Sequence, residues 1–416
     1  METAGRSIFD TIFDPRAVAI IGASPSDQAT LSQMKTKIRE RLYLVNPKYT
    51  EVLGKKCYPS ILDVEAEIDY VIIGISAALL PQVLEQCIQK GVKVAQLFTA
   101  GFSETGIPER VKQEEDLKKL AKGRIRLLGP NCFGVYCLKT GLSIIPESPT
   151  EEGHIGVVAQ SGSFVESFSY FAETKNLRFS KMVSYGNAAD LDGADFLEYL
   201  ADDADTKLIA FYIEGTRNAP HLSAALTRAA RQKPVIAIKG GMTDQGMRAA
   251  ASHTAALAGS PDIWRAFFKQ CGALQVDNFD EMVNTLIAFD TSPLPSGRAM
   301  ALITNSGGFS VIQTDLCLRA RGAPVFSGDH RGPARPGSRG RNRHRESSGC
   351  LAHLLQCRAD GKHRRHHHDR RRRPTDPYPG FPVRSVPLFT AHPGTGDRRP
   401  HGAAHRADGR RLRTGP

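Results

Sequence analysis

One histidine has neighbours that would allow it to act as a nucleophile. His253 lies in the stretch 248–259, which is rich in Ala and Ser and shows no apolar periodicity. Small neighbours leave a ring nitrogen accessible and allow the backbone to approach a ligand closely. The stretch follows an apolar segment at 234–239 and precedes Ser260-Pro261-Asp262, which has the composition of a helix start. We therefore predict that His253 lies on a loop between a strand and a helix, either as a reactive residue or as an ordinary loop histidine.

Glu214 is an acid that could assist such a histidine. It follows the apolar segment 208–213 and precedes Gly215. A carboxylate that accepts a hydrogen bond from one imidazole nitrogen fixes the tautomer and leaves the other nitrogen nucleophilic. The alternative is a solvated acid at the end of a strand. Together with His253, Glu214 predicts a catalytic pair.

Two similar turns could bind an anion. The sequences Gln-Ser-Gly-Ser-Phe at 160–164 and Asn-Ser-Gly-Gly-Phe at 305–309 each follow an apolar segment. A helix that begins with small residues presents free N–H groups and the positive end of its dipole. We therefore expect two helix starts to be aimed at one phosphate. The predicted phosphate-binding residues are Ser161, Gly162, Ser163, Asn305, Ser306, Gly307 and Gly308.

An α/β framework must position these residues. Residues 7–137 alternate apolar segments with helical patterns, which is typical of βαβ units and a mostly parallel sheet. Ligands bind at the carboxyl ends of the strands of such sheets. Glycine occurs in four of the five expected strand ends, which favours a nucleotide-type site, although the dinucleotide fingerprint G-x-G-x-x-G is absent. These ends are Gly22-Ala23-Ser24-Pro25, Asn46-Pro47, Gly74-Ile75-Ser76, 99–102 and 129–132.

Further α/β units follow after a polar linker at 138–152. Residues 153–290 predict a second doubly wound domain, with strands at 155–159, 181–184, 207–213, 234–238 and 273–276. Residues 298–324 predict the start of a third α/β domain, with a strand at 299–304 and a helix at 310–321.

Composition changes abruptly near residue 325. The whole chain of 416 residues carries a net charge of +12, but residues 330–416 alone carry +15, with 20 Arg, 10 His and neither Ile nor Met. Such a composition cannot form a packed core, so we predict that residues 325–416 are a disordered tail. A basic arm that binds nucleic acid is one interpretation. We favour translation of a GC-rich gene in a shifted frame, and nucleic acid is then not an expected partner.

Cysteine usage and hydropathy exclude other classes. The eight cysteines are scattered without metal-ligand spacing, so no metal site is predicted. The sequence shows no signal peptide and no apolar run of the roughly 18 residues that span a membrane. We expect a cytoplasmic protein with reduced thiols and no membrane contact.

The ordered motifs resemble those of the nucleoside-diphosphate-forming acyl-CoA synthetases, which include ADP-forming acetyl-CoA synthetase and the succinyl-CoA synthetase α subunit. The resemblance extends over about residues 7–323. It implies a Rossmann-like CoA-binding domain at 7–137 and a flavodoxin-like succinyl-CoA synthetase domain at 153–290. The motifs that carry it are Ile21-Gly22-Ala23-Ser24, Asn46-Pro47, Gly129-Pro130-Asn131-Cys132, Val158–Gly162, Ile213-Glu214-Gly215 and Ser252-His253-Thr254.

The resemblance assigns roles to residues at matching positions. It implies that His253 is the phosphorylated histidine and that Glu214 is its carboxylate partner. Two departures stand out: Ala255 occupies a position where the family usually has Gly, and residues 24–32 contain no glycine. The implied CoA-binding residues are Gly22, Ala23, Ser24, Asn46, Pro47, Ser76, Gly101, Asn131 and Cys132.

The implied reaction joins a carboxylic acid to CoA at the expense of ATP, which becomes ADP and phosphate, through an acyl phosphate and a phosphohistidine. In the family an ATP-grasp module, fused downstream or present as a separate subunit, binds the nucleotide and Mg²⁺. No such module is recognisable here, so we expect a separate ATP-grasp subunit as a partner and an isolated chain that is inactive. The other expected partners are CoA, a carboxylic acid, phosphate and further copies of the chain. The alternatives are a regulatory CoA-binding region of a protein acyltransferase and a non-enzymatic CoA-binding or nucleic-acid-tethered protein.

Overall fold

The computed structural model describes residues 7–143, 151–247, 260–293, 300–302, 304, 306–321 and 355–357. The chain divides into two compact units, residues 1–297 and 298–416. Within the described residues no helix has both the length and the apolar character needed to cross a membrane. His253 and Asn305 lie outside the described residues.

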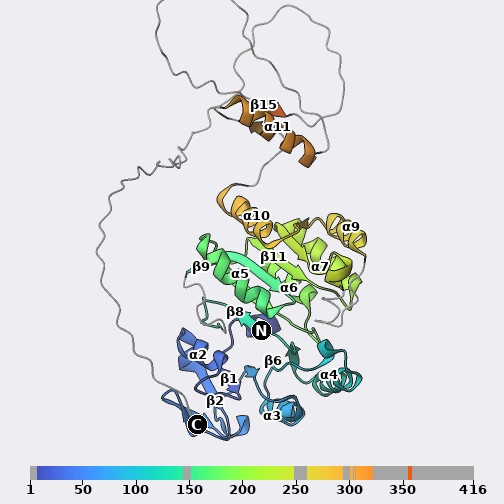
Figure 1. Ribbon diagram of the computed structural model, residues 1–416. Coiled ribbons are helices and arrows are strands. Elements are labelled where there is room, and N and C mark those ends of the chain that lie inside the picture. Colours follow the sequence, from blue (N-terminus) through green and yellow to red (C-terminus); the bar gives the residue numbers. More distant parts are fainter. Residues whose placement is uncertain are drawn as a thin grey trace, which may run out of the picture. The chain divides into compact units, whose positions relative to one another are not determined.

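The first sheet of the larger unit has seven strands in the order β3-β4-β2-β1-β5-β6-β7. Only β3 runs antiparallel to its neighbour, β4. Helices α1 and α2 pack on one face of this sheet, and α3 and α4 pack on the other (Figure 1). Its elements are α1 (Ile8–Phe13), β1 (Val18–Ile21), α2 (Gln28–Met34), β2 (Leu42–Val45), β3 (Glu51–Val52), β4 (Lys55–Tyr58), β5 (Tyr70–Ile73), α3 (Leu80–Lys90), β6 (Val94–Leu97), α4 (Pro108–Ala121) and β7 (Arg126–Leu128).

The second sheet has six strands in the order β13-β12-β11-β9-β10-β8. All pairs are parallel except β8 with β10. Helices α5 and α10 pack on one face, and α6, α7 and α9 on the other. Its elements are β8 (Gly134–Tyr136), β9 (Glu152–Ala159), α5 (Gly162–Thr174), β10 (Phe179–Ser184), α6 (Gly193–Asp202), β11 (Leu208–Ile213), α7 (Ala219–Gln232), β12 (Val235–Lys239), α9 (Pro261–Cys271), β13 (Leu274–Gln275) and α10 (Phe279–Thr291).

The two-domain α/β fold expected from the sequence is confirmed. Each long apolar segment forms a strand because both faces of a parallel sheet are covered. In β9, for example, Ile155 and Val157 pack towards α5 whereas Val158 packs into the cluster on the opposite face. The short hairpin β3–β4 was not predicted, because its charged residues interrupt the alternation of apolar and polar side chains.

Strand β8 connects the two sheets. It lies within residues 7–137, the range expected for the first domain, yet it pairs with β10 of the second sheet, with Val135 opposite Val183. Helix α1 also contacts the second domain, because Phe13 stacks on Tyr199 of α6 with ring centroids 5.3 Å apart. One apolar cluster therefore contains residues of both sheets.

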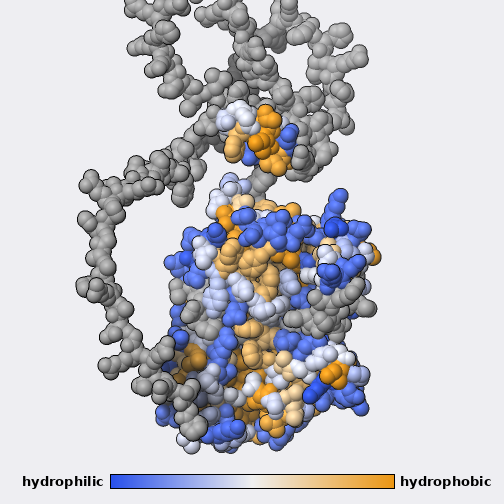
Figure 2. Space-filling model, viewed as in Figure 1, coloured by the Kyte–Doolittle hydropathy of each residue, from blue (hydrophilic) through white to orange (hydrophobic). Residues whose placement is uncertain are grey.

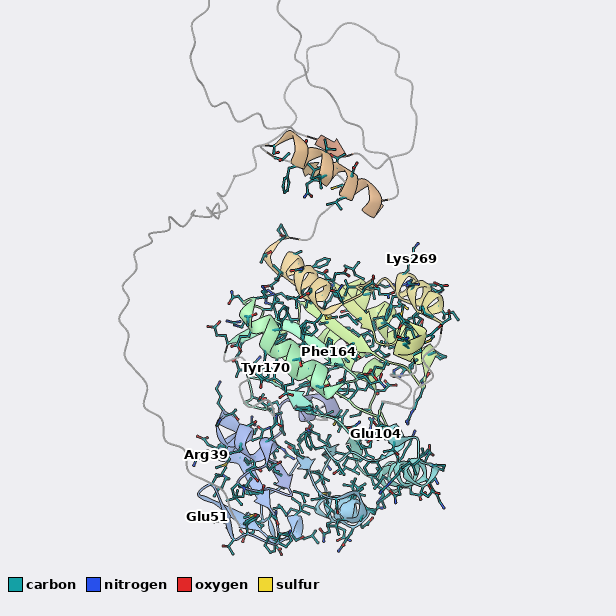
Figure 3. All side chains as sticks on the ribbon, in the orientation of Figure 1. Arg39, Glu51, Glu104, Phe164, Tyr170 and Lys269 are labelled. Carbon is teal, nitrogen blue, oxygen red and sulfur yellow. The ribbon has the colours of Figure 1, made fainter. Side chains whose placement is uncertain are left out.

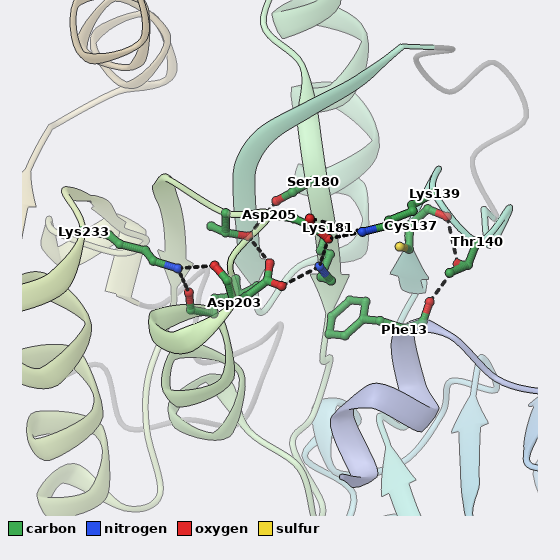
Figure 4. A network of polar contacts seen from close by, with 11 residues as sticks. Phe13, Cys137, Lys139, Thr140, Ser180, Lys181, Asp203, Asp205 and Lys233 are labelled. Carbon is green, nitrogen blue, oxygen red and sulfur yellow. Dashed lines mark hydrogen bonds and ion pairs between the residues drawn. The ribbon is translucent and has the colours of Figure 1, made fainter. Parts of the chain in front are cut away.

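A network of charged and polar groups supports this junction (Figure 4). Lys181 of β10 donates to Asp203 at 2.8 Å and to Asp205 at 3.3 Å, and Lys139 beyond β8 also binds Asp205, at 3.0 Å. The side chains of Lys181 and Asp203 are both buried. The next residue after Lys139, Thr140, donates to the carbonyl of Phe13 at 2.7 Å, so the network ties α1 to the second sheet.

The smaller unit contains α11 (Gly307–Arg321) and an antiparallel pair of strands, β14 (Met300–Leu302) and β15 (Leu355–Cys357). Strand β15 lies within residues 325–416, the range expected to be a disordered tail, and it gives β14 a neighbour. Several apolar side chains of α11 are exposed, including Phe309, Val311 and Ile312 (Figure 2). The remaining residues of the tail lie outside the described residues.

The buried ion pair makes a prediction about stability. Replacing Lys181 by Met leaves the buried Asp203 carboxylate without its cation, which should lower the free energy of unfolding by about 3 kcal/mol. The matched control is Lys119→Met, which removes an exposed pair with Asp116 and should cost less than about 1 kcal/mol. Urea denaturation of the two variants measures both values, and equal losses would contradict the structural role of Lys181.

Candidate active site

The carboxyl ends of β1 and β2 form the first part of a continuous edge. The amide of Gly22 donates to the carbonyl of Val45 at 2.9 Å, and Asn46 Nδ2 donates to the carbonyl of Ala23 at 2.8 Å. Gly22 has a φ of +97°, and a Cβ atom there would lie 2.3 Å from the carbonyl oxygen of Gly74, at the end of β5. The glycine is therefore required for the close approach of the β1 and β5 turns.

The ends of β5, β6 and β7 continue this edge. Thr99 Oγ1 donates to the carbonyl of Ile75 at 2.8 Å, and the amide of Asn131 donates to the carbonyl of Thr99 at 3.0 Å. All five strand-end turns are thus linked in one row, as the alternation of strands and helices predicted. Of the nine residues expected to bind CoA, only Ala23 and Cys132 are buried, and the other seven are partly or fully accessible at these turns.

Gly101 and Cys132 have contacts that the sequence did not indicate. The amide of Gly101 donates to Glu104 Oε1, and the amide of Phe102 donates to Glu104 Oε2 at 3.0 Å, so a carboxylate of the same loop occupies both donors. The Cys132 thiol is buried and directs its hydrogen towards the carbonyls of Leu97 and Leu128. Burial raises the pKa of Cys132 to about 12, which keeps the thiol protonated and unreactive.

A cleft of about 300 Å³ lies between the two sheets at this edge. One wall comes from the turns after β6 and β7, including Phe98 and Asn131, and the other comes from the start of α5 and the turn after β10. The cleft brings together five residues of the expected CoA and phosphate sites: Asn131, Cys132, Ser161, Gly162 and Ser163. Ala100 and Gln160 belong to the expected turns at 99–102 and 160–164, whereas the lining residues not foreseen from the sequence are Phe98, Phe133, Gly186 and Asn187.

Helix α5 begins at the cleft as the sequence predicted. Ser161 is its N-cap, and its Oγ accepts a hydrogen bond from the amide of Phe164 at 3.3 Å and lies 3.1 Å from Ser163 Oγ. The second turn has the same cap, because Ser306 Oγ accepts from the amide of Phe309 at 3.4 Å. The two turns therefore share their local geometry. The convergence of their dipoles on one phosphate stays a prediction.

Glu214 is buried at the end of β11, with 5% of its surface exposed, which excludes a solvated acid. Tyr212 Oη donates to Glu214 Oε1 at 3.1 Å. The amides of Glu214 and Gly215 donate to Gln160 Oε1 at 2.8 and 3.1 Å. Since Gln160 lines the cleft, the backbone that carries Glu214 is fixed to the site.

Lys239 is a buried cation beside Glu214 that the sequence analysis did not single out. It ends β12, opposite Ile213 of β11, and its Nζ lies 5.1 Å from the centroid of the Trp264 ring. Burial lowers the pKa of Lys239 to about 8, and the charge of Glu214 opposes that shift. The sequence does contain a feature that could have indicated this residue, because Lys239 ends an otherwise apolar strand, Val-Ile-Ala-Ile-Lys.

The segment that carries His253 leaves the second sheet next to Glu214. The amide of Gly240, directly after β12, donates to the carbonyl of Ile213 at 2.9 Å. A Cβ atom on Gly240 would lie 3.2 Å from Cγ of Glu214, so the segments that follow β11 and β12 pack against each other. The description resumes at Ser260, the N-cap of α9, as the helix start Ser260-Pro261-Asp262 predicted. His253 itself lies outside the described residues, and its role stays a prediction.

One group of side chains has the composition of a metal site, although none was expected. Asp192, Asp195 and His221 have potential ligand atoms within 4.8 Å of one another. Both carboxylates are already engaged in the capping box of α6, where Asp192 accepts from the amide of Asp195 and Asp195 accepts from the amide of Asp192. Capping explains this cluster without an ion.

Comparison with known proteins matches both domains. The family model of a CoA binding domain matches residues 16–137, and that of a succinyl-CoA ligase-like flavodoxin domain matches residues 152–289. The chain is 40% identical over 309 residues to an ADP-forming acetate–CoA ligase of Methanocaldococcus jannaschii, with 73% of this chain and 43% of that protein aligned. It is 39% identical over 313 residues to the α subunit of ADP-forming acetate–CoA ligase II of Pyrococcus furiosus, with 74% and 68% aligned.

A solved structure agrees with these matches. The dinucleotide-forming acetyl-coenzyme A synthetase 1 of Ca. Korarchaeum cryptofilum, in complex with phosphate and ADP, superimposes with a TM-score of 0.70 at 32% identity, covering 76% of this chain and 69% of that chain. Fold and site thus define a CoA-binding domain joined to a succinyl-CoA ligase-like flavodoxin domain. The chain belongs to the family of ADP-forming acyl-CoA synthetases, as the resemblance implied. It spans less than half the length of the Methanocaldococcus relative.

The start of α5 gives a prediction with a matched control. A Cβ atom on Gly162 would lie 2.2 Å from Cδ2 of Phe133, whereas one on Gly307, at the same position of the second turn, would meet nothing within 4 Å. Gly162→Ala should therefore displace the Phe133 ring and destabilise the larger unit by about 1–3 kcal/mol. Gly307→Ala should leave the unfolding midpoint unchanged. Thermal denaturation compares the two, and an unchanged Gly162→Ala variant would contradict the tight contact.

Proposed function

We propose that this chain is the CoA-binding and phosphohistidine-carrying part of an ADP-forming acyl-CoA synthetase. The reaction is acid + CoA + ATP ⇌ acyl-CoA + ADP + phosphate. The observation that carries the proposal is the cleft, where the turns of the CoA-binding domain meet the start of α5. Glu214 is held to the same cleft through Gln160.

The residues around the cleft suit a thioester and a phosphate. The turns after β1 and β2 would hold the body of CoA, and Asn131 would lie near its acylated end. The start of α5 lines the cleft and carries no side chain at Gly162, and a helix N-terminus stabilises a bound phosphate. In the direction that forms ATP, phosphate would attack the thioester carbonyl of the acyl-CoA. A C–O bond forms, the C–S bond breaks and CoA leaves as thiolate.

His253 would then accept the phosphoryl group. The neutral imidazole attacks the phosphorus of the acyl phosphate, the N–P bond forms, and the carboxylate of the acid leaves with the electrons of the broken P–O bond. Glu214 would accept a hydrogen bond from the other imidazole nitrogen and stabilise the positive charge that develops on the ring. Lys239, which ends the strand next to the one that Glu214 follows, would help to balance its charge between turnovers.

A separate subunit would complete the reaction. The Pyrococcus relative is named an α subunit, and we propose that this chain likewise works with an ATP-grasp partner that binds ADP and Mg²⁺. Transfer of a phosphoryl group depends mainly on positioning and on electrostatic stabilisation. The role of this chain is then to present a phosphohistidine to that partner.

The nucleophile can be tested by labelling. When the chain is incubated with γ-³²P-labelled ATP, Mg²⁺ and the ATP-grasp subunit of a relative, it should acquire an acid-labile, base-stable phosphoryl group. His253→Asn should abolish the label because the attacking nitrogen is lost, while CoA affinity stays near that of the unaltered chain. His221→Asn, at the partly exposed start of α7, is the control and should label normally. Label on the His253→Asn chain would refute the assignment.

The carboxylate can be tested in the same assay. Glu214→Gln keeps the shape of the side chain but removes the charge that supports the imidazolium, so the rate of labelling should fall by about 10²–10⁴-fold. Glu198→Gln, which alters a partly exposed acid of α6, should have no effect. A fall of less than threefold would mean that Glu214 supports only the fold.

A further inference from the structure

Glu114 is a buried carboxylate at the boundary between the two domains. It lies on α4 with 4% of its surface exposed, in the same buried stripe as Leu117 and Ala121. Its sequence neighbours, Lys112 to Asp116, are mostly charged and would place it on a solvated helix face. A buried carboxylate is stable only when its oxygens are satisfied by donors.

The donors to Glu114 come from three different loops. Ser103, in the turn after β6, donates to Oε2 with its amide at 3.2 Å and with its hydroxyl at 2.6 Å. Asn187, in the turn after β10, donates to Oε2 at 2.8 Å. Arg217, in the turn after β11, donates to Oε1 at 3.1 Å. One carboxylate of the CoA-binding domain thus holds two loops of the flavodoxin-like domain.

Each of these loops belongs to the candidate active site. Asn187 lines the cleft, and its Oδ1 lies 3.4 Å from Nδ2 of Asn131. Arg217 follows Glu214 by three residues, and the amides of Glu214 and Gly215 are fixed to Gln160. A displacement of Arg217 is therefore transmitted along a short, hydrogen-bonded segment to Glu214.

The third loop is the turn after β6, which carries the expected CoA-binding residue Gly101. Glu104, which is labelled in Figure 3, accepts from the amides of Gly101 and Phe102 and also from Asn187 Nδ2, at 2.6 Å. The side-chain amide of Asn187 consequently bridges two carboxylates, those of Glu104 and Glu114. Any movement of the Gly101 turn when a ligand binds at this edge changes both contacts of Asn187.

We infer that Glu114 is a positioning residue that couples the CoA-binding turn at 99–104 to the Glu214 loop at 213–217. Ligand binding at the first loop fixes the positions of Ser103 and Asn187, which both donate to Glu114. Glu114 in turn holds Arg217, and Arg217 orders the backbone that carries Glu214. The inference rests on the proposed function, because it assigns CoA to one loop and the phosphoryl chemistry to the other.

The chemistry of the cluster favours this role over a purely stabilising one. The buried Glu114 carboxylate is paired with one guanidinium, that of Arg217, which is half exposed to solvent. Buried ionic groups of this kind are often no more stabilising than apolar residues of the same volume, whereas their directional bonds fix the geometry. Coupling between two sites requires an element that contacts both, and Glu114 provides those contacts.

Hydrogen exchange on the full chain tests the coupling. Saturating CoA should slow amide exchange in peptides that cover 213–217 at least fivefold, although these residues lie in the other domain. In Glu114→Gln this protection should fall below twofold while CoA affinity, measured by calorimetry, stays within threefold of the unaltered chain. A merely structural role would change stability but would leave the CoA-dependent protection in place.

Two further variants complete the test. Glu85→Gln, which alters an exposed pair with Arg124 on α3, should keep the full protection. The double variant Glu114→Met with Arg217→Met replaces the ion pair by apolar side chains, so it should fold and bind CoA but show no protection. Protection that persists in either Glu114 variant, or CoA binding without protection in the unaltered chain, would overturn the inference. Absence of CoA binding in the unaltered chain would instead overturn the proposed function, and the inference with it.

Discussion

The pairing of β8 with β10 is the constraint on which the candidate site depends. A cleft between two domains has a defined shape only if the domains are fixed to each other, and here a strand of the first section completes the second sheet. The shared apolar cluster and the Lys181 network reinforce that junction. As a result the turns after β6 and β7 face the start of α5 at a fixed separation, which is the condition for catalysis by positioning.

Much of this arrangement follows from simple rules applied to the sequence. Parallel strands bring their carboxyl ends to one edge, so the turns at Gly22, Asn46 and Asn131 were expected to lie together, and they do. The Ser-Gly turn at 161–162 was recognisable as a helix start because a hydroxyl cap and small residues are required there. These features depend on local composition and on sheet topology, and both can be read from one chain.

Other features depend on contacts between distant segments and could not be read in that way. Strand β8 has only three residues, too few to show a period, and its partner is nearly fifty residues away. Glu114 lies in a charged run that predicts exposure, yet tertiary packing buries it. Gly186 and Asn187 follow β10, so the rule that ligands bind at the carboxyl ends of parallel strands would have indicated them. The role of His253 stays a prediction, because its segment lies outside the described residues.

The path of β8 also limits how this gene could be rearranged. The two family models meet between residues 137 and 152, where a linker invites a break. A break there would leave the first fragment with an unpaired strand and the second with an open edge at β10, and such edges recruit foreign strands. A workable fission point must therefore lie beyond α10 or before β8.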